Sequence, residues 1–167
     1  AINLSKASEW NVEGANLSDG KGPSCQDVKE LPAGTASLDV CADHYHRYKE
    51  DIKLMAEMGF KTYRFSIAWT RLIPNGTGEV NQAGIDHYND VINTCLEYNI
   101  EPLVTMFHFD MPDALDKRGS WSNPESVDWF VNFAKVMFEN FGDRVKYWLT
   151  INEQNMLTLV GPIIGTL

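Results

Sequence analysis

Two short polar clusters follow apolar stretches of the sequence, and their side chains are of types that take part in chemistry. The apolar run IEPLVTMF at 100–107 continues into His108 and Asp110, and a second run at 145–151 continues into NEQN with Glu153. A carboxyl group can transfer protons, and imidazole and amide groups can hydrogen-bond to the hydroxyls of a ligand. The two clusters are therefore candidate parts of a functional site.

One interpretation of these clusters is structural. Asp110 would pin a loop, and His108 would be a core histidine whose ring nitrogens are satisfied inside the protein. Glu153 would begin a helix, where the helix dipole favours a carboxylate. In this interpretation neither cluster touches a ligand.

The other interpretation is functional. Glu153 would donate a proton, while His108 and Asn152 would hold a ligand that is rich in hydroxyl groups. Trp69 and Trp121 would offer flat apolar faces to sugar rings, which carry hydroxyls at their edges and C–H groups on their faces. Residue spacing does not decide between the two interpretations.

Alternating secondary-structure patterns would bring the two clusters together. From residue 43 onward, helical and strand-like patterns alternate, which is typical of βα units around a parallel sheet. Helices are expected over 43–58, 81–98 and 124–141, and strands over 62–67, 100–107 and 145–151. Catalytic groups in such folds come from the carboxyl ends of the strands and from the loops that follow them. Both polar clusters stand at such positions.

The length of the chain limits how much of such a fold it can hold. One more strand is expected before residue 14, which makes four strands and three helices. A (β/α)8 barrel typically needs about 250 residues, whereas this chain has 167. We therefore expect residues 1–167 to form the N-terminal half of a single α/β barrel domain.

Composition argues against several classes of partner. The net charge of −9 at pH 7 disfavours nucleic acid and anionic membrane surfaces. No apolar run approaches the roughly 20 residues of a membrane span, and the first residues lack the pattern of a signal peptide. The three cysteines show neither a CxxC motif nor a Cys/His ligand spacing, so no zinc site or disulfide framework is indicated. We expect a cytoplasmic protein that holds no metal.

Several long segments closely resemble glycoside hydrolase family 1, which includes β-glucosidases and 6-phospho-β-glycosidases. The resemblance covers residues 11–155. Its segments are DGKGPS at 19–24, the stretch 44–81, IEPLVTMFHFDMPDAL at 100–115, GSWSNP at 119–124 and FGDRVKYWLTINEQ at 141–154. The resemblance implies a (β/α)8 barrel and a retaining glycosidase mechanism with two glutamates and no cofactor.

The resemblance also implies roles for individual residues. Glu153 in TINEQ matches the general acid/base, and Asn152 matches the residue that contacts the sugar 2-hydroxyl. His108 matches a ligand for a sugar hydroxyl near O3. Arg64 in YRFS matches the arginine that keeps the nucleophile ionised. Asn11 stands where the family usually has a glutamine that grips O3 and O4.

Three departures from the family pattern bear on the substrate. Phe109 replaces the more usual tryptophan, Gln154 replaces proline, and Ser120 precedes Trp121 where glucosidases have glycine. These changes are more frequent among phosphate-specific members. The expected substrate is therefore a small-molecule β-glucoside, and these changes favour a 6-phospho-β-glucoside. The sequence does not decide between the phosphorylated and the free glucoside.

The nucleophile glutamate of the family lies in an ENG motif, and no such string occurs in these 167 residues. A retaining enzyme needs two carboxylates about 5–5.5 Å apart. We therefore expect the isolated chain to be inactive and the complete protein to perform the hydrolysis. The alternative is a non-catalytic sugar-binding or assembly-dependent half-barrel, whose open sheet edge would favour self-association.

Overall fold

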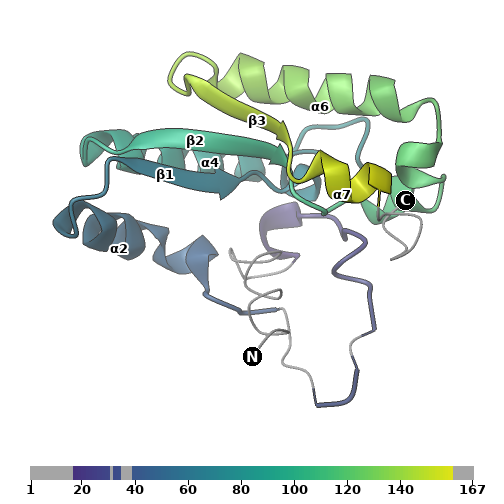
Figure 1. Cartoon of the computed structure of the whole chain (residues 1–167), viewed down its shortest axis with the longest axis horizontal. Coiled ribbons are helices and arrows are strands. Elements are labelled where there is room, and N and C mark those ends of the chain that lie inside the picture. Colours follow the sequence, from purple (N-terminus) through teal and green to yellow (C-terminus); the bar gives the residue numbers. More distant parts are fainter. Residues whose placement is uncertain (1–16, 31, 35–38, 160–167) are drawn as a thin grey trace.

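The computed structural model describes residues 17–30, 32–34 and 39–159, and in this part of the chain a parallel sheet is the central feature (Figure 1). Its strands, in spatial order, are β1 (Thr62–Ser66), β2 (Glu101–Phe107) and β3 (Tyr147–Ile151). The register places Arg64 beside Leu103 and Thr105 beside Leu149. Because all three strands run the same way, their carboxyl ends meet at one edge of the sheet.

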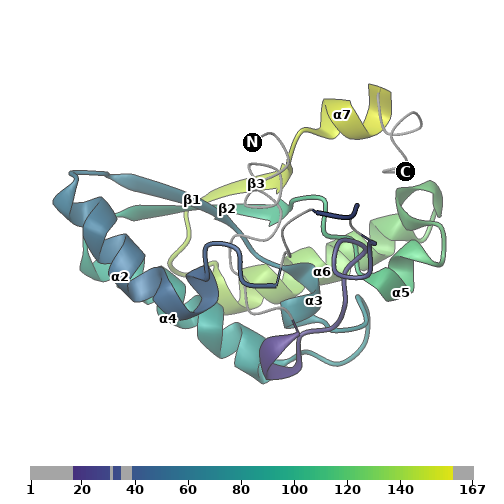
Figure 2. The same cartoon turned by 90° about the horizontal axis from the view of Figure 1, so that it is seen from below.

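Three long helices cover one face of this sheet, as Figure 2 shows. They are α2 (His44–Glu57), α4 (Gln82–Glu97) and α6 (Ser126–Phe141). Helix α4 connects β1 to β2, and α6 connects β2 to β3, so each crossover is a βαβ unit. None of the helices in the described ranges has the length and apolar character needed to cross a membrane.

Short helices follow the strands at their carboxyl ends. They are α3 (Trp69–Leu72) after β1, α5 (Asp113–Asp116) and the 3-10 helix η2 (Ser120–Ser122) after β2, and α7 (Gln154–Leu159) after β3. A further 3-10 helix, η1 (Ser18–Gly20), lies near the start of the described chain. The hydrophobic periodicity did not predict these elements, because none of them is long enough to show a helical period.

The long helices form because each has one apolar face. In α4 the buried residues recur at intervals of three and four: Ile85, Tyr88, Val91, Ile92 and Cys95. Helix α2 is followed by Gly59 with φ of +85°, a left-handed conformation that glycine adopts without steric cost. The six predicted helices and strands are confirmed within about two residues at each end, and the strand expected before residue 14 lies outside the described residues.

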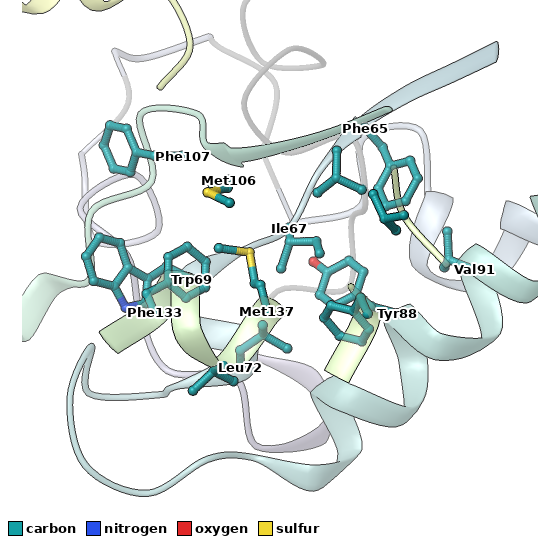
Figure 3. Close-up of a cluster of buried hydrophobic side chains, with 14 of the residues drawn as sticks. Phe65, Ile67, Trp69, Leu72, Tyr88, Val91, Met106, Phe107, Phe133 and Met137 are labelled. Atoms are coloured by element: carbon teal, nitrogen blue, oxygen red, sulfur yellow. The ribbon is translucent and has the colours of Figure 1, made fainter. Parts of the chain in front are cut away.

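The hydrophobic core lies between the sheet and its helices (Figure 3). Phe65 and Val104 are neighbours in the register and are 7% and 0% exposed. Because side chains alternate along a strand, the residues next to Phe65 and Val104 in the sequence point to the other face. Arg64 and Thr105 therefore lie on the face that α2, α4 and α6 do not cover.

Candidate active site

The two polar clusters lie side by side at the carboxyl edge of the sheet. Strands β2 and β3 are hydrogen-bonded neighbours, and the backbone N–H of Asn152 donates to the carbonyl of Phe107 at 2.9 Å. His108 follows directly after β2, and Glu153 follows Asn152. Parallel pairing thus brings together residues that are about 45 positions apart in the sequence.

A hydrogen-bonded chain of three side chains links β1, β2 and the residue that follows β3. The guanidinium of Arg64 on β1 donates from Nη2 to Oδ1 of Asn152 at 2.6 Å. It also donates from Nε to Oγ1 of Thr105 on β2 at 3.0 Å. Arg64 and Asn152, 88 residues apart in the sequence, therefore belong to one local structure.

The side-chain amide of Asn152 is oriented by this contact. An arginine has donors but no acceptor, so the oxygen of the amide must face Arg64. The amide nitrogen Nδ2 is then turned away, and it is buried without a hydrogen-bond partner among the described residues. Leaving a buried donor unpaired costs on the order of 1–3 kcal/mol, a cost that an acceptor on a ligand would remove.

Asp110 pins the loop after β2. Its carboxylate accepts hydrogen bonds from the backbone N–H groups of His108 and Trp69, each at 3.2 Å. Burial raises the pKa of Asp110 to about 6, against the lowering effect of these two donors and of the Lys21 charge. The structural interpretation is therefore correct for Asp110. His108 itself is half-buried, with its ring 5.8 Å from that of Phe109.

Glu153 occupies the turn between β3 and α7. Its φ is +46°, and its carbonyl accepts a hydrogen bond from Met156 N–H at 2.8 Å, so it precedes the first residue of the helix. Its side chain is exposed. Phe109, two residues after β2, is also left-handed, with φ of +63°. Non-glycine residues in this conformation are uncommon, and each polar cluster contains one, but six other described residues share the conformation, so it does not by itself mark the site.

A cavity of about 450 Å³ lies beside the residues that follow β2, and His108, Asn152 and Glu153 are not among the residues that line it. Phe107, Phe109, Trp121 and Leu157 form part of its wall. The ring of Trp121 packs edge-on against Phe107 with centroids 5.0 Å apart, and its indole N–H is buried without a hydrogen-bond partner in the described part of the chain. The cavity thus offers aromatic surface, which is a feature of small-molecule sites.

The cavity is also lined by Cys25, Gln26 and Lys29, which the sequence did not suggest as site residues. The amide Nε2 of Gln26 donates to the carbonyl of Phe109 at 3.0 Å, which connects this segment to the loop after β2. Burial, and then the charges of Asp116 and Asp110, raise the pKa of the Cys25 thiol to about 12. Cys25 therefore stays protonated and is no nucleophile. No local motif marked these residues, because they meet the site only through contacts across 83 positions.

The prediction that Trp69 offers a face to sugar rings is wrong. Trp69 is 0% exposed, and its ring stacks on Phe133 with centroids 4.6 Å apart and an interplanar angle of 3° (Figure 3). Its indole N–H donates to the carbonyl of Gly76 at 3.0 Å. The reason is that α3 begins at Trp69 and turns this ring toward α6, into the core.

The structure describes every predicted site residue except one. Asn11 lies outside the described residues. His108, Asn152 and Glu153 follow the carboxyl ends of β2 and β3, whereas Arg64 lies in the middle of β1 and reaches Asn152 by a hydrogen bond. Within residues 17–30, 32–34 and 39–159, no group of three or more His, Cys, Asp or Glu side chains could hold a metal ion.

Comparison with known proteins identifies a consistent set of relatives. The family described as Glycosyl hydrolase family 1 matches residues 4–167. The chain is 47% identical over 160 residues to β-glucosidase A of Thermotoga maritima, which covers 93% of this chain and 36% of that protein. It is 47% identical over 164 residues to coniferin β-glucosidase of Pinus contorta, and this match covers 95% of this chain and 32% of that protein.

Solved structures give the same result. A family 1 β-glucosidase from Thermotoga maritima matches with a TM-score of 0.86 at 46% identity, covering 92% of this chain and 36% of that one. The same enzyme in complex with castanospermine matches with a TM-score of 0.85. The chain therefore spans about a third of the length of the curated relatives it matches.

Proposed function

This chain belongs to glycosyl hydrolase family 1, and we propose that the protein that carries it hydrolyses β-glucosides with retention of configuration. The observation that carries the proposal is the link between Arg64 and Asn152 directly beside Glu153, at the carboxyl edge of a parallel sheet. Its relatives from Thermotoga maritima and Pinus contorta are named as β-glucosidases. A small-molecule glucoside is therefore the proposed substrate.

In the proposed mechanism Glu153 protonates the departing glycosidic oxygen and later removes a proton from the attacking water. A second glutamate, which these 167 residues do not supply in an ENG motif, forms and releases the glycosyl-enzyme. Arg64 supports that second carboxylate by its positive charge.

The hydroxyl groups of the sugar would be held by neutral donors and acceptors. Asn152 presents its buried Nδ2 to the 2-hydroxyl, where the hydrogen bond strengthens in the transition state. His108 would bind a second hydroxyl near O3, and Asn11 would contribute from the N-terminal residues. Such contacts select a polyhydroxylated ligand over an apolar one because each unpaired buried polar group is costly.

A 6-phospho-β-glucoside is the second candidate substrate. It is favoured by Phe109, Gln154 and Ser120, at which this chain departs from the pattern of the glucosidases. Rates on nitrophenyl β-glucoside and on its 6-phosphate, measured side by side, separate the two. A preference of about tenfold or more for either compound decides between them.

The experiment that tests the hydrolytic role is Glu153→Gln in the complete protein. We expect cleavage of glucosides with poor leaving groups, such as alkyl glucosides, to fall by about a hundredfold or more. Cleavage of a dinitrophenyl glucoside, whose leaving group needs no proton, should fall far less. Glu139→Gln, on the exposed side of α6, is the matched control and should change neither rate. Equal losses on both substrates would contradict acid catalysis by Glu153.

A non-catalytic, assembly-dependent role is the alternative. It is favoured by apolar side chains on the outer surface of α6 and on β3, where Val131, Phe138 and Tyr147 are 60%, 49% and 57% exposed. Such a surface promotes self-association. Both proposals expect the isolated 167-residue chain to turn over no nitrophenyl β-glucoside, but this alternative also expects its mass in solution to exceed 18.9 kDa. Measurable turnover by a monomer would exclude it.

We also propose a cytoplasmic, reducing location. Cys25, Cys41 and Cys95 are all free thiols, a state that is usual in reducing compartments. Fractionation of the source cells tests this, and recovery of the protein in an extracellular or periplasmic fraction would contradict it.

A further inference from the structure

Thr105 is a buried hydroxyl residue in the middle of the apolar strand β2. It is 1% exposed, and its neighbours across the sheet are Ser66 and Leu149. Its Oγ1 accepts the hydrogen bond from Nε of Arg64 at 3.0 Å. Thr105 has no role in the proposed mechanism, and this hydrogen bond connects its side chain to the candidate site.

The contact with Thr105 restricts how Arg64 can lie. A guanidinium group is planar, so two hydrogen bonds from Nε and Nη2 fix both the position and the plane of the group. The side chain of Arg64 is long and has many rotamers, so a second hydrogen bond narrows the positions that it can take. The hydroxyl of Thr105 therefore holds Arg64 in the place where it meets Asn152.

The orientation of the Asn152 amide depends in turn on Arg64. With the guanidinium in place, Oδ1 faces Arg64 and Nδ2 is presented as a donor. Without it, a half-turn of the amide would exchange the oxygen and the nitrogen with little change in shape. The site would then present an acceptor, or a mixture of both, where a ligand hydroxyl must accept a hydrogen bond.

We propose that Thr105 is a positioning residue that, through Arg64, keeps the Asn152 amide oriented to donate to a hydroxyl of the bound sugar. The proposal rests on the glucosidase function proposed above and adds a determinant of selectivity for the sugar 2-hydroxyl. Thr105 touches no reacting atom in this role. Its loss should therefore affect substrates according to whether they carry that hydroxyl.

The test compares Thr105→Val with Thr105→Ser in the complete protein. Valine keeps the shape of threonine and removes the acceptor, whereas serine keeps the acceptor. Both are assayed on a nitrophenyl β-glucoside and on its 2-deoxy analogue, after thermal melting has shown that they fold. If Thr105→Val does not fold, Thr105→Ala, which removes the same hydroxyl, takes the place of the valine variant in the comparison.

We expect Thr105→Val to lower kcat/KM on the glucoside about tenfold, the effect of one misoriented hydrogen bond in the transition state, and on the 2-deoxy analogue less than about twofold. Thr105→Ser should retain wild-type rates on both within about threefold. Equal losses on the two substrates, or no loss on either, would overturn the proposal while leaving the glucosidase function intact. A wild-type protein with no activity on the glucoside would instead refute the proposed function, and this inference with it.

Discussion

The two faces of the sheet differ in what covers them and in what their side chains do. On the face toward α2, α4 and α6, Phe65 and Val104 are 7% and 0% exposed. On the opposite face Tyr147 and Leu149 are 57% and 39% exposed, and Arg64 reaches across to Asn152. The covered face supplies packing energy, and the open face supplies the polar groups that could bind a ligand.

This difference separates stability from chemistry within one set of strands. Because neighbouring residues of a strand point to opposite faces, a change at one position can destabilise the fold while a change at the next alters only the site. Asp110 lies between the core and the site, since its carboxylate accepts hydrogen bonds from the backbone of Trp69 in the core and of His108 at the site. Substitutions in the core and at the site test whether stability and activity change independently.

The largest expected effect is on stability, from Trp69→Ala. Removing this ring from between the sheet and Phe133 should lower the free energy of unfolding by about 3–5 kcal/mol. Tyr147→Ala, on the open face, is the control and should cost less than about 1 kcal/mol. Urea unfolding of the protein measures both. Comparable losses for the two variants would mean that the faces do not differ in the way described.

A second, intermediate effect is expected on activity alone, from Asn152→Asp. The new carboxylate would pair with Arg64 and keep the fold, but it would lose the Nδ2 donor, so kcat/KM should fall about 10- to 100-fold with an unchanged melting temperature. Asn93→Asp makes the same change beside a different arginine, Arg144, which contacts Asn93 at 2.8 Å far from the site. It should leave both quantities unchanged. A lowered melting temperature for Asn152→Asp would show that the open face also carries stability.

A third effect is expected on the pH dependence of stability, and it comes from Asp110. Burial raises the pKa of this carboxyl to about 6 in the folded protein, above its ordinary value of 3.8. Its contribution to stability is therefore complete below about pH 4 and is lost as the pH rises through about 6. The free energy of unfolding of the wild type should fall relative to that of Asp110→Asn over this range. Parallel pH profiles for the two proteins would contradict this assignment.

Much of the architecture could be predicted from the sequence. Apolar residues at three- and four-residue spacing predicted α2, α4 and α6, and the apolar runs predicted β2 and β3, because these patterns are local. The predicted fold class, an α/β barrel of the (β/α)8 type of which this chain holds a part, is confirmed by the match to a family 1 β-glucosidase with a TM-score of 0.86. The described residues supply three of its expected strands.

The candidate site could be predicted only in part. Its position at the carboxyl ends of β2 and β3 followed from the polar residues after each apolar run, and the roles given to Glu153, His108 and Asn152 stay predictions. Trp69 was wrongly assigned because residue type does not reveal to which side a short helix turns a ring. Thr105 was missed, although it is the one hydroxyl residue in IEPLVTMF and could have been noticed as such.

The sequence by itself determined the local elements, the family resemblance and the residue types available for chemistry. Only the tertiary structure decided which of these residues meet. Arg64 and Asn152 are 88 positions apart, and their contact at 2.6 Å exists because parallel pairing aligns β1, β2 and β3 in one register. Hydrogen bonding between strands sets that register, and no local pattern in the sequence specifies the partner across the sheet.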